Sequence, residues 1–264
     1  MKVGFIGLGN MASAMIGGIT GKGILPAGDI LGASKSSESV EKAVKAFGIT
    51  GMQDNHEVAK QADILILSVK PQMYADVIAS IKDDVKEDVI FVSIAPGKTM
   101  QWLSEQFGKV LKIVRCMPNT PALVGEGCTG VCHNEKVSEG EFCEVMKLLG
   151  SFGKAIEVPE HLMDTVVGVS GSSPAYVFMF IEAMADAAVA DGMPRKQAYE
   201  FSAQAVLGSA KMVLETGKHP GELKDMVCSP GGTTIEGVTV LEKSNLRSAV
   251  IEAQRAVTAK SKNM

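Results

Sequence analysis

The first 120 residues alternate between short apolar runs and longer amphipathic segments. Apolar runs typical of buried strands lie at 2–7, 30–33, 64–69, 89–94 and 112–116, and helical patterns separate them. Regular alternation of strands and helices predicts a parallel sheet that is covered by helices on both faces.

The pattern changes after about residue 160, where strand signals disappear. A helix is predicted over 174–191 before Gly192, and a second runs from Pro194 to Thr216 and stops at Gly217. Shorter helices are predicted over 220–227, 233–242 and from 245 to the tail. This part of the chain is therefore expected to be an all-helical domain.

The first long helix is apolar on nearly every side. Residues 176–181 read YVFMFI, and only Glu182 and Asp186 form a narrow polar stripe. A small helical domain cannot cover such a helix completely, so we expect a second subunit to do so. The apolar helix therefore predicts contact with a partner subunit.

A glycine-rich turn follows the first apolar run. Gly7-Leu8-Gly9-Asn10-Met11-Ala12 is the GxGxxA form of the dinucleotide fingerprint, placed between a strand and a helix. Gly7 permits the turn, Gly9 admits a pyrophosphate, and Ala12 lets the helix pack on the strand. A glycine-rich turn without a ligand is the alternative. The candidate cofactor contacts here are Ile6, Gly7, Gly9, Asn10, Met11 and Ala12.

Together these patterns define the expected fold class and domains. We predict an α/β protein with an N-terminal Rossmann-type, doubly wound sheet over 1–160, followed by an all-α helical domain over 161–264. The loops after the third and fourth strands, 68–71 and 93–97, leave the carboxyl edge of the sheet, where such folds bind their ligand. Their prolines could equally be plain strand stops.

The end of the second strand indicates which dinucleotide is bound. An NAD-preferring fold has an acid there, whereas this chain has Ser34 and Lys35, and Asp29 lies at the strand's start. A lysine among hydroxyls suits a 2'-phosphate. NADPH is therefore the expected cofactor, with NADH possible; a solvated loop in which Ser36 or Ser37 caps the next helix is the alternative.

Charge, cysteine content and hydropathy limit the classes of binding partner and the cellular compartment that are expected. The net charge is −4 without a run of like charge, so nucleic acid and anionic membranes are unfavoured. Five cysteines without a CxxC spacing indicate reduced thiols. Glycines interrupt the N-terminal apolar run, which argues against a secretory signal peptide. No stretch is expected to cross a membrane, because Glu182 and Asp186 interrupt the apolar segment 176–190. A cytoplasmic protein is predicted.

A second glycine turn lies near the C-terminus, in SPGGTTIEG at 229–237. Thr233 and Glu236 have the spacing of a capping box, with Thr233 as the predicted N-cap. Gly231 and Gly232 leave the helix amides bare, so a small carboxylate can bind there. An ordinary turn between helices is the alternative.

The whole chain resembles the pyrroline-5-carboxylate reductases. The resemblance is carried by VGFIGLGNMA, SVKP, RCMPNTPA, SGSSPAY, DGMPR and, most specifically, HPGELKDMVCSPGGTTIEGVTVLE at 219–242. One departure is Ser173, where the family usually has glycine.

The resemblance implies that 161–264 is an all-α helical substrate-binding and dimerisation domain and that the protein is a homo-oligomer built from dimers. It also implies the chemistry and the site residues. It implies reduction of 1-pyrroline-5-carboxylate to L-proline, with substrate bound by Ser229, Gly231, Gly232, Thr233 and Thr234. Thr234 is the implied catalytic residue, through a hydrogen bond to the ring nitrogen. Asn55 is an implied contact to the adenosine side. The implied contacts at the nicotinamide end are Val69, Lys70, Ile94 and Ala95, and Pro71 is a further predicted cofactor contact.

No other catalytic arrangement stands out. There is no Ser/His/Asp set, metal-ligand spacing or carboxylate pair, and the four histidines are scattered and read as surface or capping residues. Reduction of a protonated imine depends mainly on how the protein positions the reactants.

Two other functions stay open. A 3-hydroxyacid dehydrogenase has a lysine in its first interdomain helix, which 174–191 lacks, and a non-catalytic NADPH-binding regulator is not excluded.

Overall fold

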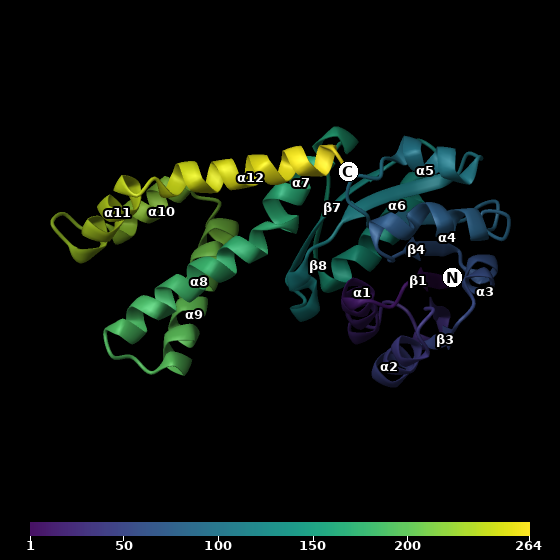
Figure 1. Cartoon of the computed structure of the whole chain (residues 1–264), viewed down its shortest axis with the longest axis horizontal. Coiled ribbons are helices and arrows are strands. Elements are labelled where there is room, and N and C mark those ends of the chain that lie inside the picture. The colour runs from purple at the N-terminus through teal and green to yellow at the C-terminus, as the bar shows by residue number, and fades with distance from the viewer. The chain divides into compact units, whose positions relative to one another are not determined.

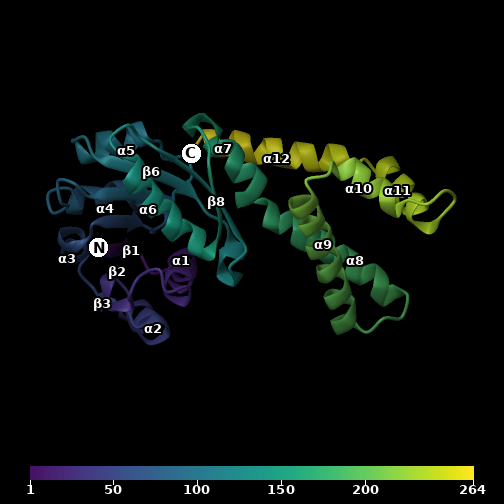
Figure 2. The same cartoon turned by 180° about the vertical axis from the view of Figure 1, so that it is seen from behind.

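The computed structural model describes residues 1–264, which form two compact units. The first unit contains Met1–Ser172 and the final residues Val257–Met264, and the second contains Ser173–Ala256. Figures 1 and 2 show their elements from opposite sides. Residues 161–172 therefore pack with the first unit, and the functional domain ranges 1–160 and 161–264 stay a prediction.

The first unit is built on one eight-stranded sheet. Its strand order is β3-β2-β1-β4-β5-β6-β7-β8, and every neighbouring pair is parallel except β6 and β7. The strands are β1 (Val3–Ile6), β2 (Ile30–Ala33), β3 (Thr50–Met52), β4 (Ile64–Leu67), β5 (Ile90–Ser93), β6 (Lys112–Met117), β7 (Gly127–His133) and β8 (Gly153–Glu157). The five predicted strands and the doubly wound sheet are confirmed, whereas β3, β7 and β8 were not predicted.

Helices cover both faces of this sheet. Helices α1 (Asn10–Gly21), α2 (Ser37–Phe47) and α6 (Glu139–Leu149) share a core with one set of strand side chains. On the other face lie α3 (Asn55–Gln61), α4 (Tyr74–Ile81) and α5 (Met100–Phe107). Because alternate strand residues point to opposite faces, Phe5 belongs to the first core and Ile6 to the second. The topology reverses between β1 and β4, where this fold class opens its ligand crevice.

The strand-rich unit ends in a helical connector. Helix α7 (Met163–Val166) continues as a π-helical turn, Val167–Gly171, before the second unit begins. The last turn of the chain returns to this connector, since the Ser261 hydroxyl donates to Asp164 Oδ1 at 2.6 Å. Both residues belong to the first unit.

The second unit is entirely helical, as predicted. It contains α8 (Ser173–Ala190), α9 (Arg195–Thr216), α10 (Pro220–Val227), α11 (Thr233–Lys243) and most of α12 (Leu246–Lys262). Only Ala185 of α8 is buried within one chain, and Phe178 and Met179 are 60% and 68% exposed. A single chain therefore leaves the apolar surface of α8 uncovered.

This helical run also meets the length and composition of a membrane span. Glu160–Ala190 contains an 18-residue window with a mean hydropathy of 1.3, of which 6% is buried. Glu182 and Asp186 therefore do not exclude a span by composition, contrary to the argument from the sequence, and the expectation that no stretch crosses a membrane stays a prediction. Length and composition are weak evidence for a span, and contact with a second subunit also covers apolar surface of this kind.

Candidate cofactor and substrate sites

The turn between β1 and α1 is shaped by close backbone packing. Gly7 has φ +100°, and a Cβ there would lie 2.8 Å from the carbonyl carbon of Ser68 and from the Val69 nitrogen. The Ser68 hydroxyl donates to the Gly7 carbonyl at 2.7 Å. Only glycine fits this position. Gly9 is the N-cap of α1 and has no side chain that bonds to the helix amides. The amides at the start of α1 are therefore available to an anion.

A pocket of about 370 Å³ opens beside this turn. Its lining is Ile6, Gly7, Leu8, Gly9, Ser34, Lys35, Ser39, Asn55, Ser68, Val69, Lys70, Met73 and Val77. No acid is among these residues. Neither Lys35 nor Lys70 forms an ion pair. The pocket thus combines free helix amides with two unpaired cations, which suits a ligand that carries several negative charges.

The hydroxyls at the end of β2 hold the start of α2. Ser34 Oγ accepts from the Ser36 amide at 3.3 Å, and Ser36 Oγ accepts from the Ser39 amide at 3.3 Å as the N-cap. The predicted capping role of Ser36 is confirmed, and it leaves Lys35 exposed at the pocket. Asp29 lies directly before β2, at the opposite edge of the sheet, as expected.

The predicted cofactor residues divide into two groups. Those that line the pocket are Ile6, Gly7, Gly9, Ser34, Lys35, Asn55, Val69 and Lys70, and those outside its lining are Asn10, Met11, Ala12, Pro71, Ile94 and Ala95. Ala12 and Ala95 are 0% and 2% exposed, so neither residue offers an accessible surface to a ligand in this structure. All these contacts stay a prediction. Five further residues line the pocket but were not predicted as individual contacts: Leu8, Ser39, Ser68, Met73 and Val77. Ser68 belongs to the loop 68–71, which was predicted to lie at the ligand edge of the sheet.

The C-terminal glycine turn leads directly into α11. Gly231 has φ +68°, a left-handed conformation that favours glycine, and the Gly232 amide donates to the Ser229 carbonyl at 3.0 Å. The predicted N-cap at Thr233 was wrong: Gly232 is the N-cap, and no side chain caps the helix. The turn brings the chain into helical geometry one residue earlier than the capping-box spacing suggests.

This helix start therefore presents bare amides and two free hydroxyls. Thr233 is exposed and Thr234 is half-buried, and neither hydroxyl has a hydrogen-bond partner within the chain. Unbonded amides at a helix N-terminus attract a carboxylate, and a free hydroxyl can both donate and accept. The predicted substrate residues Ser229, Gly231, Gly232, Thr233 and Thr234 thus lie together in one turn, but their roles stay a prediction.

Comparison with known proteins accounts for the whole length of the chain. A family model described as pyrroline-5-carboxylate reductase dimerisation matches residues 160–264, and one described as coenzyme F420-dependent NADP oxidoreductase matches 2–97. The pyrroline-5-carboxylate reductase of Escherichia coli K12 is 51% identical over 263 residues, covering 100% of this chain and 98% of that protein. The chain belongs to the pyrroline-5-carboxylate reductase family.

More distant members of the family support the same assignment. The pyrroline-5-carboxylate reductase of Methanosarcina acetivorans is 42% identical and covers 100% of this chain and 97% of its own. A Plasmodium falciparum pyrroline carboxylate reductase, solved with NADP bound, superposes with a TM-score of 0.91 at 35% identity and covers 100% of this chain and 97% of that one. Prephenate dehydrogenase from Aquifex aeolicus, at 16% identity and a TM-score of 0.54, shares the fold alone.

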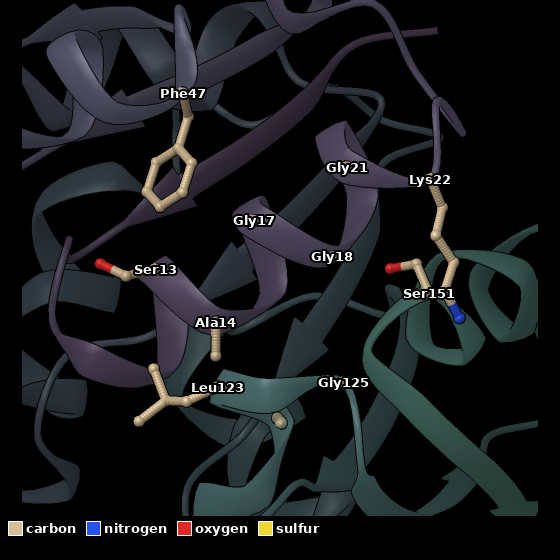
Figure 3. Close-up of a pocket in the computed structure, with 11 residues that line it drawn as sticks. Ser13, Ala14, Gly17, Gly18, Gly21, Lys22, Phe47, Leu123, Gly125 and Ser151 are labelled. Atoms are coloured by element: carbon tan, nitrogen blue, oxygen red, sulfur yellow. The ribbon is translucent and has the colours of Figure 1, made fainter.

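This pyrroline-5-carboxylate reductase family member has a second pocket along α1, which carries no evident chemistry. Figure 3 shows the cavity of about 430 Å³ between α1, Phe47 and the 3-10 turn Thr120–Val124. Lys22 is its only charged lining residue, and the Lys22 ammonium group donates to the Gly150 carbonyl at 3.4 Å. The remaining lining is mostly glycine, alanine and apolar side chains, so the cavity offers no acid–base pair.

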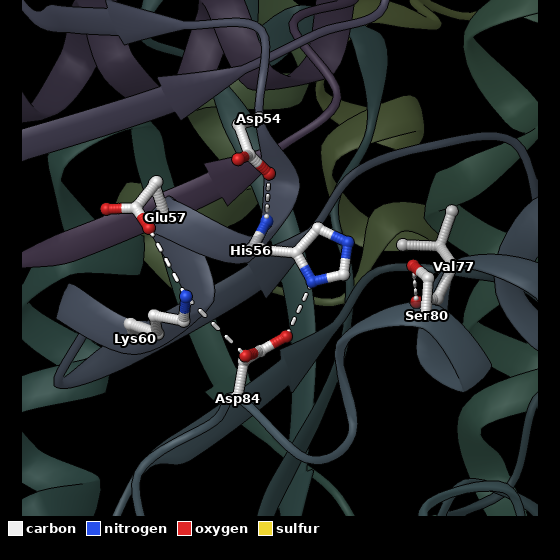
Figure 4. Close-up of polar contacts among 7 residues, drawn as sticks. All are labelled: Asp54, His56, Glu57, Lys60, Val77, Ser80 and Asp84. Atoms are coloured by element: carbon white, nitrogen blue, oxygen red, sulfur yellow. Dashed lines mark hydrogen bonds and ion pairs between the residues drawn. The ribbon is translucent and has the colours of Figure 1, made fainter.

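The histidines of this family member serve in surface and capping contacts. His56, which follows pocket residue Asn55, lies 2.6 Å from Asp84 Oδ2, and Lys60 bridges Asp84 and Glu57, as Figure 4 shows. The bond from His56 lowers the pKa of Asp84. His219 caps α10 by accepting from the Gly221 amide at 3.0 Å. The predicted surface or capping role is confirmed for these two histidines.

Proposed function

We propose that this protein reduces 1-pyrroline-5-carboxylate to L-proline, with NADPH as the hydride donor. Membership of the pyrroline-5-carboxylate reductase family over the whole chain carries the proposal. The acid-free pocket beside the β1–α1 turn supports it, because its two unpaired lysines suit a cofactor with a 2'-phosphate.

The residues of the first unit suggest which of them would hold the cofactor. Gly9 and the first amides of α1 would bind the pyrophosphate, and Ser34 and Lys35 would bind the 2'-phosphate. Asn55 contacts the adenosine side. Val69, Lys70, Ile94 and Ala95, in the strand-end loops, would contact the nicotinamide end, and Pro71 would be a further cofactor contact. NADH binds the same pocket without the phosphate contact, so we expect it to be the weaker donor.

The GGTT turn holds the substrate by its two polar ends. The amides around Gly231 to Thr234 bind the carboxylate, and Ser229 completes the turn. The protonated ring nitrogen donates to the Thr234 hydroxyl, which has no competing partner within the chain. When bound, NADPH supplies a hydride to the carbon of the C=N bond, and the nitrogen becomes the amine of proline. No general base is required, so orientation supplies most of the rate.

The assembly that we propose is a homo-oligomer built from dimers in the cytoplasm. The uncovered apolar surface of α8 and the match to the dimerisation family model support the dimer. Sedimentation at assay concentrations tests this: no active, folded monomer should be present. An active monomer would contradict the proposed dimer but not the proposed reaction.

One assay tests the reaction. Purified protein is mixed with 1-pyrroline-5-carboxylate and NADPH, the nicotinamide absorbance is followed, and the product is identified as proline. Binding of NADPH without oxidation in the presence of substrate contradicts the enzyme and favours a regulator. Oxidation of a 3-hydroxyacid with NADP, but no reduction of the pyrroline, favours the dehydrogenase rival.

A further inference from the structure

One buried phenol joins the ends of two neighbouring strands of the sheet. Tyr74, the first residue of α4, is 0% exposed. Its hydroxyl donates to the Leu67 carbonyl at the end of β4 at 2.5 Å, and it accepts from the Ile94 amide directly after β5 at 3.2 Å. The phenol thus bridges the two strands at the edge where this fold class binds its ligand.

The protonation state of this phenol suits the bridge. Burial raises the pKa of Tyr74 well above its usual value, so the hydroxyl stays protonated at every physiological pH. A protonated phenol can donate once and accept as well. Tyr74 uses both capacities on the backbone, one on each strand end.

A second hydroxyl extends the connection to β1. Ser68, directly after Leu67, donates to the Gly7 carbonyl at 2.7 Å and lies 3.2 Å from the Ile6 carbonyl. The ends of β1, β4 and β5 are therefore linked in series by Ser68 and Tyr74. Ile6, Gly7 and Ser68 line the nucleotide pocket, while Tyr74 does not.

We propose that Tyr74 is a positioning residue for hydride transfer, because its hydroxyl sets the spacing of the loops after β4 and β5. The inference rests on the proposed function, in which these loops hold the nicotinamide end of the cofactor. Hydride transfer depends steeply on the distance and angle between donor and acceptor carbons. Binding of the adenosine and phosphate portions depends on other residues and should respond far less.

Replacement of Tyr74 by phenylalanine isolates the hydroxyl. Tyr74→Phe keeps the ring in the core but leaves the Leu67 carbonyl and the Ile94 amide without the phenol that now satisfies them. Backbone groups that lose a hydrogen bond away from solvent seek new partners, and the two loops are then free to shift. The matched control is Ser151→Ala. Ser151 is 2% exposed, and its hydroxyl donates to the Leu148 carbonyl at 2.6 Å in the α6 region, outside the nucleotide pocket.

The test compares steady-state rates, cofactor binding and isotope effects on the full-length protein. For Tyr74→Phe we expect kcat to fall about tenfold or more, with the dissociation constant for NADPH changed less than about twofold. We also expect a larger primary deuterium isotope effect on kcat with NADPH labelled at the transferred hydrogen. Ser151→Ala should lower the melting temperature but alter none of these three quantities.

Other outcomes separate the inference from the proposed function. If the wild-type protein does not reduce the pyrroline, the proposed function itself is contradicted. An active wild type with a Tyr74→Phe variant of unchanged kcat and isotope effect overturns only the positioning role. If Tyr74→Phe cannot be purified folded, Ser93→Ala replaces it, because Ser93 Oγ lies 3.5 Å from the phenol oxygen and accepts from the Ala95 amide at 3.4 Å. An unchanged kcat and isotope effect in Ser93→Ala also overturns the inference.

Discussion

We predict that preference for NADPH over NADH depends on one ammonium group at the end of β2, that of Lys35. Lys35→Met removes that charge and keeps most of the side chain's apolar length. The wild-type lysine is exposed and lines the pocket without an ion-pair partner, so its charge is available to a 2'-phosphate. A phosphate monoester carries about −1.5 to −2 charges at neutral pH. One pair of unit charges about 4 Å apart in a water-like surrounding interacts by about 1 kcal/mol.

The lost contact is therefore worth about 1.5 to 2 kcal/mol after solvent screening, or roughly ten- to thirtyfold in affinity. The Michaelis constant for NADPH should rise by that factor in Lys35→Met, and that for NADH should stay nearly the same. The difference should shrink in about 1 M salt, where the screening length is about 3 Å.

Steady-state kinetics with both cofactors measure this selectivity. Lys70→Met is the matched control, since Lys70 is the other unpaired lysine of the pocket but follows β4 instead of β2. We expect it to weaken NADPH and NADH by similar factors. Equal losses for the two cofactors in Lys35→Met would refute the assignment of Lys35 to the 2'-phosphate.

Three further substitutions test the site and the stability of the fold. Thr234→Val should lower turnover on the order of ten- to a thousandfold with little change in melting temperature, because its hydroxyl has no partner within the chain; undiminished turnover contradicts the catalytic role. Thr129→Val should stabilise the protein by about 1 kcal/mol in urea unfolding, because the Thr129 hydroxyl is fully buried without a partner; a lower urea midpoint contradicts it. The hydrogen bond from Lys112, followed by that from the Ser138 amide, lowers the pKa of Glu141 to about 2. Ionised Glu141 therefore stabilises the folded protein above the unfolded pKa of about 4.3, and this stabilisation is lost as the pH falls towards 2. Glu141→Gln should accordingly lower the melting temperature at pH 7 and not near pH 2; a loss of equal size at both pH values contradicts the role of this carboxylate.

Features with local causes could be predicted before the fold was known. The turn at Gly7 and Gly9 was predicted because strand, glycine spacing and helix follow one another within about twenty residues. The helical second unit followed from apolar periodicity and from its glycine and proline boundaries. The GGTT turn was located for the same reason, since Gly231 adopts the left-handed backbone that its residue type permits.

Features that depend on distant partners could not be predicted. Strand β3 has only three residues, and β7 contains two glycines, so their pairing rather than their composition makes them strands. The antiparallel direction of β7 against β6 is likewise a matter of pairing. At α11 the local spacing was misleading, because the Ser229–Gly232 turn moved the N-cap to Gly232.

The link between Tyr74, Leu67 and Ile94 belongs to this second class. Nothing in the residues around Tyr74 indicates that its hydroxyl bonds to two strand ends, one 7 and the other 20 positions away. Helix α4 must first pack on the sheet, and only then does the phenol lie between β4 and β5. Short-range steric preferences depend only on neighbouring residues and can be predicted from them. Hydrogen bonds between separate elements form only when burial of apolar surface brings those elements together.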